Sequence, residues 1–120
     1  MPKNQINKLI EEYIEMATFH GFASSFDQAE VKKINKAANT MLKIAEVIDA
    51  MSGTQVFSKL LEHPNSSVRS WCAFNLIERM NSDTKTTKRA LDVIKELANS
   101  DSVDAYGAEL WLKQYEKTNP

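Results

Sequence analysis

One segment near the middle of the chain, LLEHPNSSVRSWCAFNL at Leu60–Leu76, carries most of the information about its architecture. Two leucines end a first helix, and His63-Pro64 stops it, because proline disfavours helical geometry in the residue before it. The polar run Asn65–Ser67 then offers side-chain oxygens that can cap the first N–H groups of a second helix. The segment therefore predicts two helices joined by a tight turn.

The second of these helices has a regular apolar face. Val68, Cys72 and Leu76 recur at every fourth residue, a spacing typical of an amphipathic helix. Ala73 is small enough to let a partner helix approach. A single hairpin of this kind cannot bury its apolar faces alone, so the pattern predicts a stack of similar hairpins.

The composition favours a single helical domain over residues 1–120. Of the 120 residues, 42% are hydrophobic and 26% are charged, which is ordinary for a globular protein. The formal net charge is −1, so no overall field attracts nucleic acid or an anionic membrane. With three glycines and three prolines there is little material for tight turns between strands. Cys72 is the only cysteine, which excludes an internal disulfide.

Apolar periodicity predicts an all-α fold of about six helices and no strand. We expect a small right-handed stack of hairpins, with an irregular helical bundle as the alternative. Ser52-Gly53-Thr54-Gln55 has the spacing of a capping box and is expected to open the third helix. The expected hairpins cover residues 1–51 (degenerate), 52–80 and 84–116. The first five expected helices cover residues 4–20, 27–50, 52–61, 66–80 and 85–98. The sixth expected helix is capped by residues 99–102 and ends near residue 115.

The second half of the chain contains a weak internal repeat. Three pairs of residues lie thirty-five positions apart: Val68 and Val103, Ala73 and Ala108, and Leu76 and Trp111. In this alignment Cys72 corresponds to Gly107. Glycine inside a helix costs about 1 kcal/mol relative to alanine, so we expect close helix packing at Gly107 to compensate.

These features resemble a known class of protein. The segment 60–76 is similar to a HEAT unit, and the chain beyond about residue 30 resembles a family of short bacterial HEAT-like proteins of unknown function. The matching residues are Ala38-Asn39, His63-Pro64-Asn65, Val68-Arg69, Trp71, Ala73, Ala90-Leu91 and Ile94. The resemblance implies an all-helical fold without known catalysis. Because related small helical proteins are often encoded beside polymorphic or contact-dependent toxins, it also implies a role in toxin immunity.

Residues that could carry chemistry are scattered. His20 and His63 do not have the spacing of zinc ligands. Cys72 lies on the apolar stripe, which favours a buried and inert thiol over a nucleophile. The isolated glycines form no loop that could cradle a phosphate. We therefore expect no enzymatic activity, no catalytic residue, no cofactor and no metal site.

The second helix of each hairpin is expected to line one concave face. A surface that mixes aromatic, amide and charged groups suits recognition of another protein. We therefore expect an immunity protein that binds a cognate toxin domain and occludes its active site. The favoured toxin is a nuclease, and charge complementarity between the two surfaces would set the specificity. The candidate partner-binding residues are Lys43, Glu46, Trp71, Asn75, Glu78, Tyr106 and Lys113, with Leu110 beside them.

Two other functions remain open from the sequence. A HEAT-type scaffold or adaptor would bind a helix or peptide of a cellular protein in the same groove. A nucleic-acid-binding repeat would use the basic cluster Lys85, Lys88 and Arg89, although the net charge disfavours direct contact with nucleic acid.

The amino-terminal sequence bears on location. Residues 1–5 are not followed by an uninterrupted apolar run, so we expect no signal peptide. No apolar stretch approaches the roughly 20 residues that cross a bilayer. We expect a cytoplasmic monomer without a membrane partner.

Overall fold

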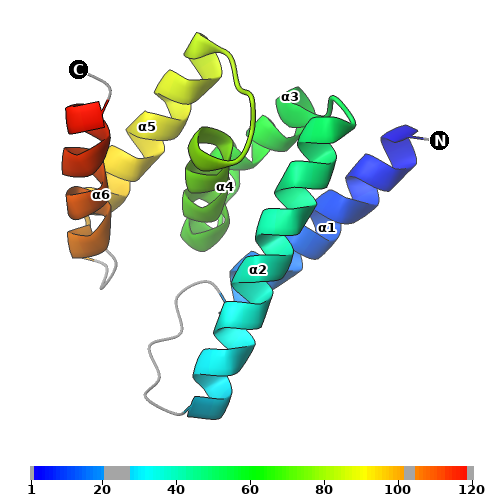
Figure 1. Ribbon diagram of the computed structural model, residues 1–120, viewed down its shortest axis with the longest axis horizontal. Helices are drawn as coiled ribbons and strands as arrows, with labels where there is room; N and C mark the ends of the chain where they lie inside the picture. The colour runs from blue at the N-terminus through cyan, green and yellow to red at the C-terminus, as the bar shows by residue number, and fades with distance from the viewer. Residues whose placement is uncertain (1, 21–27, 102–104, 119–120) are drawn as a thin grey trace.

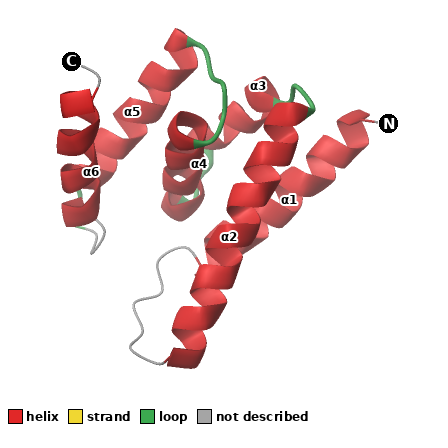
Figure 2. Ribbon diagram, viewed as in Figure 1, coloured by secondary structure: helices red, strands yellow, loops and turns green. Residues whose placement is uncertain are grey.

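The computed structural model describes residues 2–20, 28–101 and 105–118, and every regular element within these ranges is helical (Figures 1 and 2). The all-α prediction is therefore confirmed. The elements are α1 (Pro2–His20), α2 (Gln28–Ala50), α3 (Thr54–Phe57), the 3-10 helix η1 (Ser58–Glu62), α4 (Ser66–Glu78), α5 (Thr84–Ala98) and α6 (Ala105–Thr118). The predicted helix start at Asp27 and the repeat residue Val103 lie outside the described residues.

The helices pack in three successive pairs. α1 packs along α2, η1 packs against α4, and α5 packs against both α4 and α6. The short helix α3 contacts η1 and α2. α4 is central, because it also contacts α1 and α2 and lies between the α1–α2 pair and the α5–α6 pair (Figure 1). α1 and α2 lie within the expected segment 1–51, and α3, η1 and α4 lie within 52–80, whereas α6 extends to Thr118, beyond the expected end at residue 116. The right-handedness of the stack stays a prediction.

The start of α4 follows the local sequence. The Asn65 side chain accepts hydrogen bonds from the backbone N–H groups of Ser67 (2.8 Å) and Val68 (3.2 Å), as an N-cap residue does. Val68, Cys72 and Leu76 are fully buried, so the predicted apolar stripe of this helix is confirmed. The Ser67 hydroxyl also donates to the carbonyl of Ala17 at 2.7 Å, which ties α4 to α1.

The predicted capping box at Ser52 is wrong. Ser52 has a positive φ of 61° and ends α2 instead of opening the next helix. The N–H of Gly53 donates to the carbonyl of Ile48 (2.8 Å) and that of Ser52 to Asp49 (3.0 Å), the pattern of a Schellman motif. A Cβ on Gly53 would lie 3.0 Å from side-chain atoms of Ile48 and Ile6. Glycine at position 53 allows this close approach without displacing either isoleucine side chain. α3 begins without a side-chain cap.

Candidate functional site

A hollow of about 350 Å³ opens between α2, α4 and α6, with α5 contributing one residue. We call it the α2–α4–α6 hollow. Its lining is mostly small or apolar, and it consists of Ala38, Asn39, Leu42, Ser70, Trp71, Phe74, Asn75, Glu78, Leu97, Gly107 and Ala108. The three helices that contribute most of these residues are the second helices of the three hairpins, which are the helices expected to line a concave face.

Small residues on opposite walls keep the hollow open. Ala38 stands on the α2 wall, and Gly107 and Ala108 stand on the α6 wall. A Cβ placed on Gly107 would meet no atom within 4 Å. The expectation of close helix packing at Gly107 is therefore wrong: this glycine borders open space.

An aromatic cluster holds α6 beside the hollow. The Trp111 ring packs edge-on against Phe74, with 5.3 Å between the ring centroids, and stacks on Tyr115 at 5.2 Å. The Trp111 indole N–H donates to Oε1 of Glu78 at 2.5 Å. The contact with Phe74 and the bond to Glu78 join α6 to α4, and the bond holds the Glu78 carboxylate at the edge of the hollow.

Three of the predicted partner-binding residues line the hollow, all of them from α4. Trp71 is half-buried and Glu78 is exposed, as expected for a contact surface. Asn75 is different, since only 6% of it is exposed and its Nδ2 donates a hydrogen bond to the hydroxyl of Tyr13. The expected exposure of Asn75 is wrong, because its amide nitrogen is bonded to Tyr13 of α1 inside the core. Its role as a partner-binding residue stays a prediction.

The other predicted residues lie outside the lining of the hollow. Lys43 and Glu46 are exposed on α2, where the lining residues are instead Ala38, Asn39 and Leu42. Tyr106 and Lys113 are exposed on α6, and the Lys113 ammonium lies 3.7 Å from Glu109.

Sequence reasoning missed the residues of both side walls. It favoured charged, exposed side chains, whereas the walls are made of small and apolar ones. A signal was present: Ala38 in α2 and the pair Gly107-Ala108 in α6 interrupt their helices with residues too small to fill the space between them.

Tyr13 forms the centre of the core below this site. Its ring packs edge-on against Phe57, with 4.9 Å between centroids, and its hydroxyl accepts the hydrogen bond from Asn75. Burial raises the pKa of Tyr13 well above the ordinary value. The hydroxyl therefore stays protonated and acts as a structural group.

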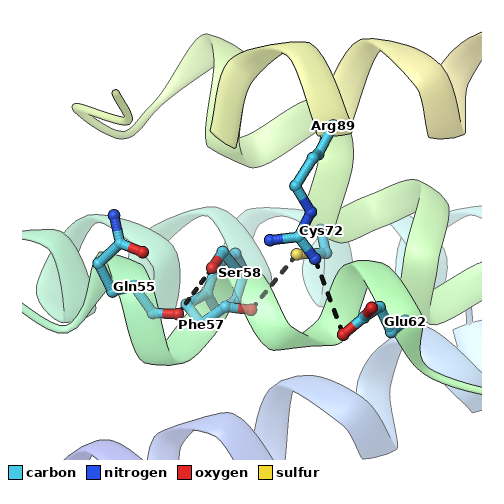
Figure 3. A network of polar contacts seen from close by, with 6 residues as sticks. All are labelled: Gln55, Phe57, Ser58, Glu62, Cys72 and Arg89. Atoms are coloured by element: carbon cyan, nitrogen blue, oxygen red, sulfur yellow. Dashed lines mark hydrogen bonds and ion pairs between the residues drawn. The ribbon is translucent and has the colours of Figure 1, made fainter. Parts of the chain in front are cut away.

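Cys72 is buried in the middle pair of helices (Figure 3). Its Sγ lies 3.5 Å from the carbonyl oxygen of Phe57 and donates toward it. Burial raises the pKa of the thiol, and the opposing influence of Arg89 is smaller. A protonated, buried thiol lacks the features of a reactive cysteine.

The basic cluster at the start of α5 is partly balanced by acids. The Arg89 guanidinium lies 3.7 Å from Glu62 of η1 (Figure 3), while Lys85 and Lys88 are exposed. Asp83 caps α5 by accepting a hydrogen bond from a backbone N–H of the first turn at 2.7 Å. Bonding to Thr86 is the main reason that the pKa of this carboxyl is lowered.

Neither a metal-ion cluster nor a membrane-spanning helix is found in the part of the chain that the structure describes. No three His, Cys, Asp or Glu side chains there could hold a metal ion together. None of the helices there has the length and apolar character to span a bilayer. Comparison of the chain with family models, with curated proteins and with solved structures gave no match.

Proposed function

We propose that this protein binds a partner protein in the α2–α4–α6 hollow, and that the partner is a bacterial toxin domain which it neutralises. The presence of the hollow is the observation that supports protein binding. Concave, mostly apolar sites with a few polar groups are where proteins usually take up peptide segments and other ligands. The choice of a toxin rests on the resemblance of the chain beyond about residue 30 to short bacterial HEAT-like proteins, because related small helical proteins are often encoded beside toxins.

Neutralisation by occlusion suits the chemistry of the surface. Trp71 is the kind of half-buried aromatic residue that anchors interfaces. Glu46 and Glu78 are exposed carboxylates on α2 and α4, and acidic groups complement the basic surface with which a nuclease holds phosphate. A nuclease domain is therefore the partner that we propose first.

The experiment is co-expression in a bacterial host with a toxin domain encoded by the neighbouring gene. We expect a one-to-one complex and loss of toxicity. Gly107→Leu places a side chain into the open space beside Gly107, so it should abolish protection while the protein stays folded. Gln5→Leu, which adds an exposed leucine on α1 away from the hollow, is the matched control and should protect like the wild type.

The outcomes separate the two parts of the proposal. If no toxin forms a complex, the immunity role fails, and a complex with another cellular protein through the hollow would instead favour an adaptor. If Gly107→Leu protects as well as Gln5→Leu, the toxin binds elsewhere on the surface and the hollow is not the site.

A further inference from the structure

The hollow carries an unbalanced negative charge at its edge. Among the described residues that line it, Glu78 is the one with a formal charge. Its carboxylate accepts a hydrogen bond from the neutral indole of Trp111, which fixes its position without neutralising it. Within the described ranges no lysine or arginine forms a salt bridge with Glu78. A cation brought to this point would find a preorganised acceptor.

An exposed apolar ridge lies on α6, the helix that forms one wall of the same hollow. Tyr106 and Leu110 are 70% and 47% exposed, and four residues apart they share one face of α6. Gly107, which lines the hollow, lies between them in sequence. A small molecule that filled the hollow would leave this ridge in water. A polypeptide could cover the hollow and the ridge together, so the surface favours a polypeptide.

We propose that the occupant is a polypeptide segment with two neighbouring apolar side chains and an adjacent lysine or arginine. The apolar side chains pack against Leu42, Trp71 and the ridge, and the cation lies beside Glu78. This inference rests on the proposed function, because it names the partner's chemistry at the same site. The volume of about 350 Å³ lies in the range in which binding pockets bury a ligand group.

A second copy of this chain is a poorer fit for the occupant. Its own α6 ridge would offer Tyr106 and Leu110, and Lys113 follows three residues after Leu110 on the same helix. That ammonium lies 3.7 Å from Glu109 of the same helix, so a carboxylate already competes for it. The complementary segment is therefore expected on a different protein.

The test is selection of random displayed peptides on the full-length protein, followed by titration of the synthetic consensus peptide. Because the chain has two tryptophans, Trp71 at the hollow and Trp111 beside it, a tryptophan-free peptide can be followed by intrinsic fluorescence. We expect the consensus sequence of the selected peptides to contain two neighbouring apolar residues and an adjacent Lys or Arg. Gly107→Leu should weaken binding at least about tenfold, since it occupies the space that the anchor needs.

The contribution of the Glu78 charge is tested separately from the contribution of the shape of the hollow. Glu78→Gln keeps an amide oxygen for the Trp111 indole and removes only the charge, so it should weaken binding about threefold and reduce its salt dependence. The controls are Gln5→Leu and Glu12→Gln, both exposed on α1, and both should bind like the wild type.

Several results would overturn the inference. These are the failure to select any peptide, an acidic or uncharged consensus, equal binding by Gly107→Leu, and a free protein that self-associates through the hollow. The selection uses no toxin, so a failed toxin complex combined with a basic–apolar consensus would reject only the immunity role. A toxin complex combined with a failed selection would reject only this occupant.

Discussion

The helices α4 and α6 hold equivalent places in the second and third hairpins, yet they are buried to very different extents. α4 buries seven of its residues, whereas Ala108 is the buried residue among those described in α6. In the thirty-five-residue alignment, buried Asn75 corresponds to exposed Leu110, and half-buried Trp71 to exposed Tyr106. α4 contacts α1, α2, η1 and α5, while α6 packs mainly on α5. Burial thus depends on a helix's neighbours more than on its own pattern.

The largest expected effect contrasts two aligned residues, Leu76 and Trp111. Leu76→Ala should lower the free energy of unfolding by about 3 kcal/mol, because it leaves a cavity in a fully buried site. Trp111→Ala should cost about 1.5 kcal/mol, because a half-buried ring loses mainly its aromatic contacts. Equilibrium urea unfolding measures both. Equal costs would mean that α6 is as firmly built into the core as α4.

The next effect concerns the polar pair that joins α1 to α4. Asn75→Leu and Tyr13→Phe each leave the other partner buried without its hydrogen bond, so each should cost about 2 kcal/mol. The double variant should recover at least about 1 kcal/mol relative to the sum, because neither polar group remains. A double-mutant cycle by urea unfolding measures this coupling. Strict additivity would show that the bond contributes nothing and that Asn75 is buried for its volume alone.

This contrast also explains what the sequence could and could not predict. The Val68–Leu76 stripe and the Asn65 cap were predicted because spacing and capping are properties of neighbouring residues. The burial of Asn75 was not, because its partner Tyr13 lies sixty-two positions away in the chain.

The same distinction applies to the candidate site. The three second helices were expected to form a concave face, and they do line the hollow. Charged residues such as Lys43 and Glu46 were expected on its α2 wall, because exposed charges suggest contact. The wall is instead shaped by a small residue, Ala38, whose significance depends on the distance between α2 and α6. That distance follows from how the hairpins pack, so it is not a local property of either helix.

The two glycines Gly53 and Gly107 offer a smaller but opposite pair of effects. Gly53→Ala should lower stability by about 1–2 kcal/mol, because the added methyl meets Ile48 and Ile6 at 3.0 Å. Gly107→Ala should raise stability by about 1 kcal/mol, because alanine is the better helix former and has open space beside it. Thermal and urea unfolding of the two variants measure whether each substitution raises or lowers the stability. A loss of stability in Gly107→Ala would indicate that the hollow is narrower than described.

The smallest effects concern how α6 is attached beside the hollow. Trp111→Phe keeps the ring stacking but loses the bond to Glu78, and an exposed hydrogen bond of this kind should contribute about 0.5–1 kcal/mol. Glu78→Gln should change stability by no more than about 0.5 kcal/mol, because its amide oxygen can still accept from the indole and the lost charge has no paired cation.

Urea unfolding of both variants at low and at physiological salt measures these two changes in stability. A cost above about 1 kcal/mol for Glu78→Gln would mean that the carboxylate charge itself holds α6 in place. In that case the aromatic cluster would not be sufficient to attach the last helix, and the exposed charge would have a structural role in place of the recognition role proposed for it.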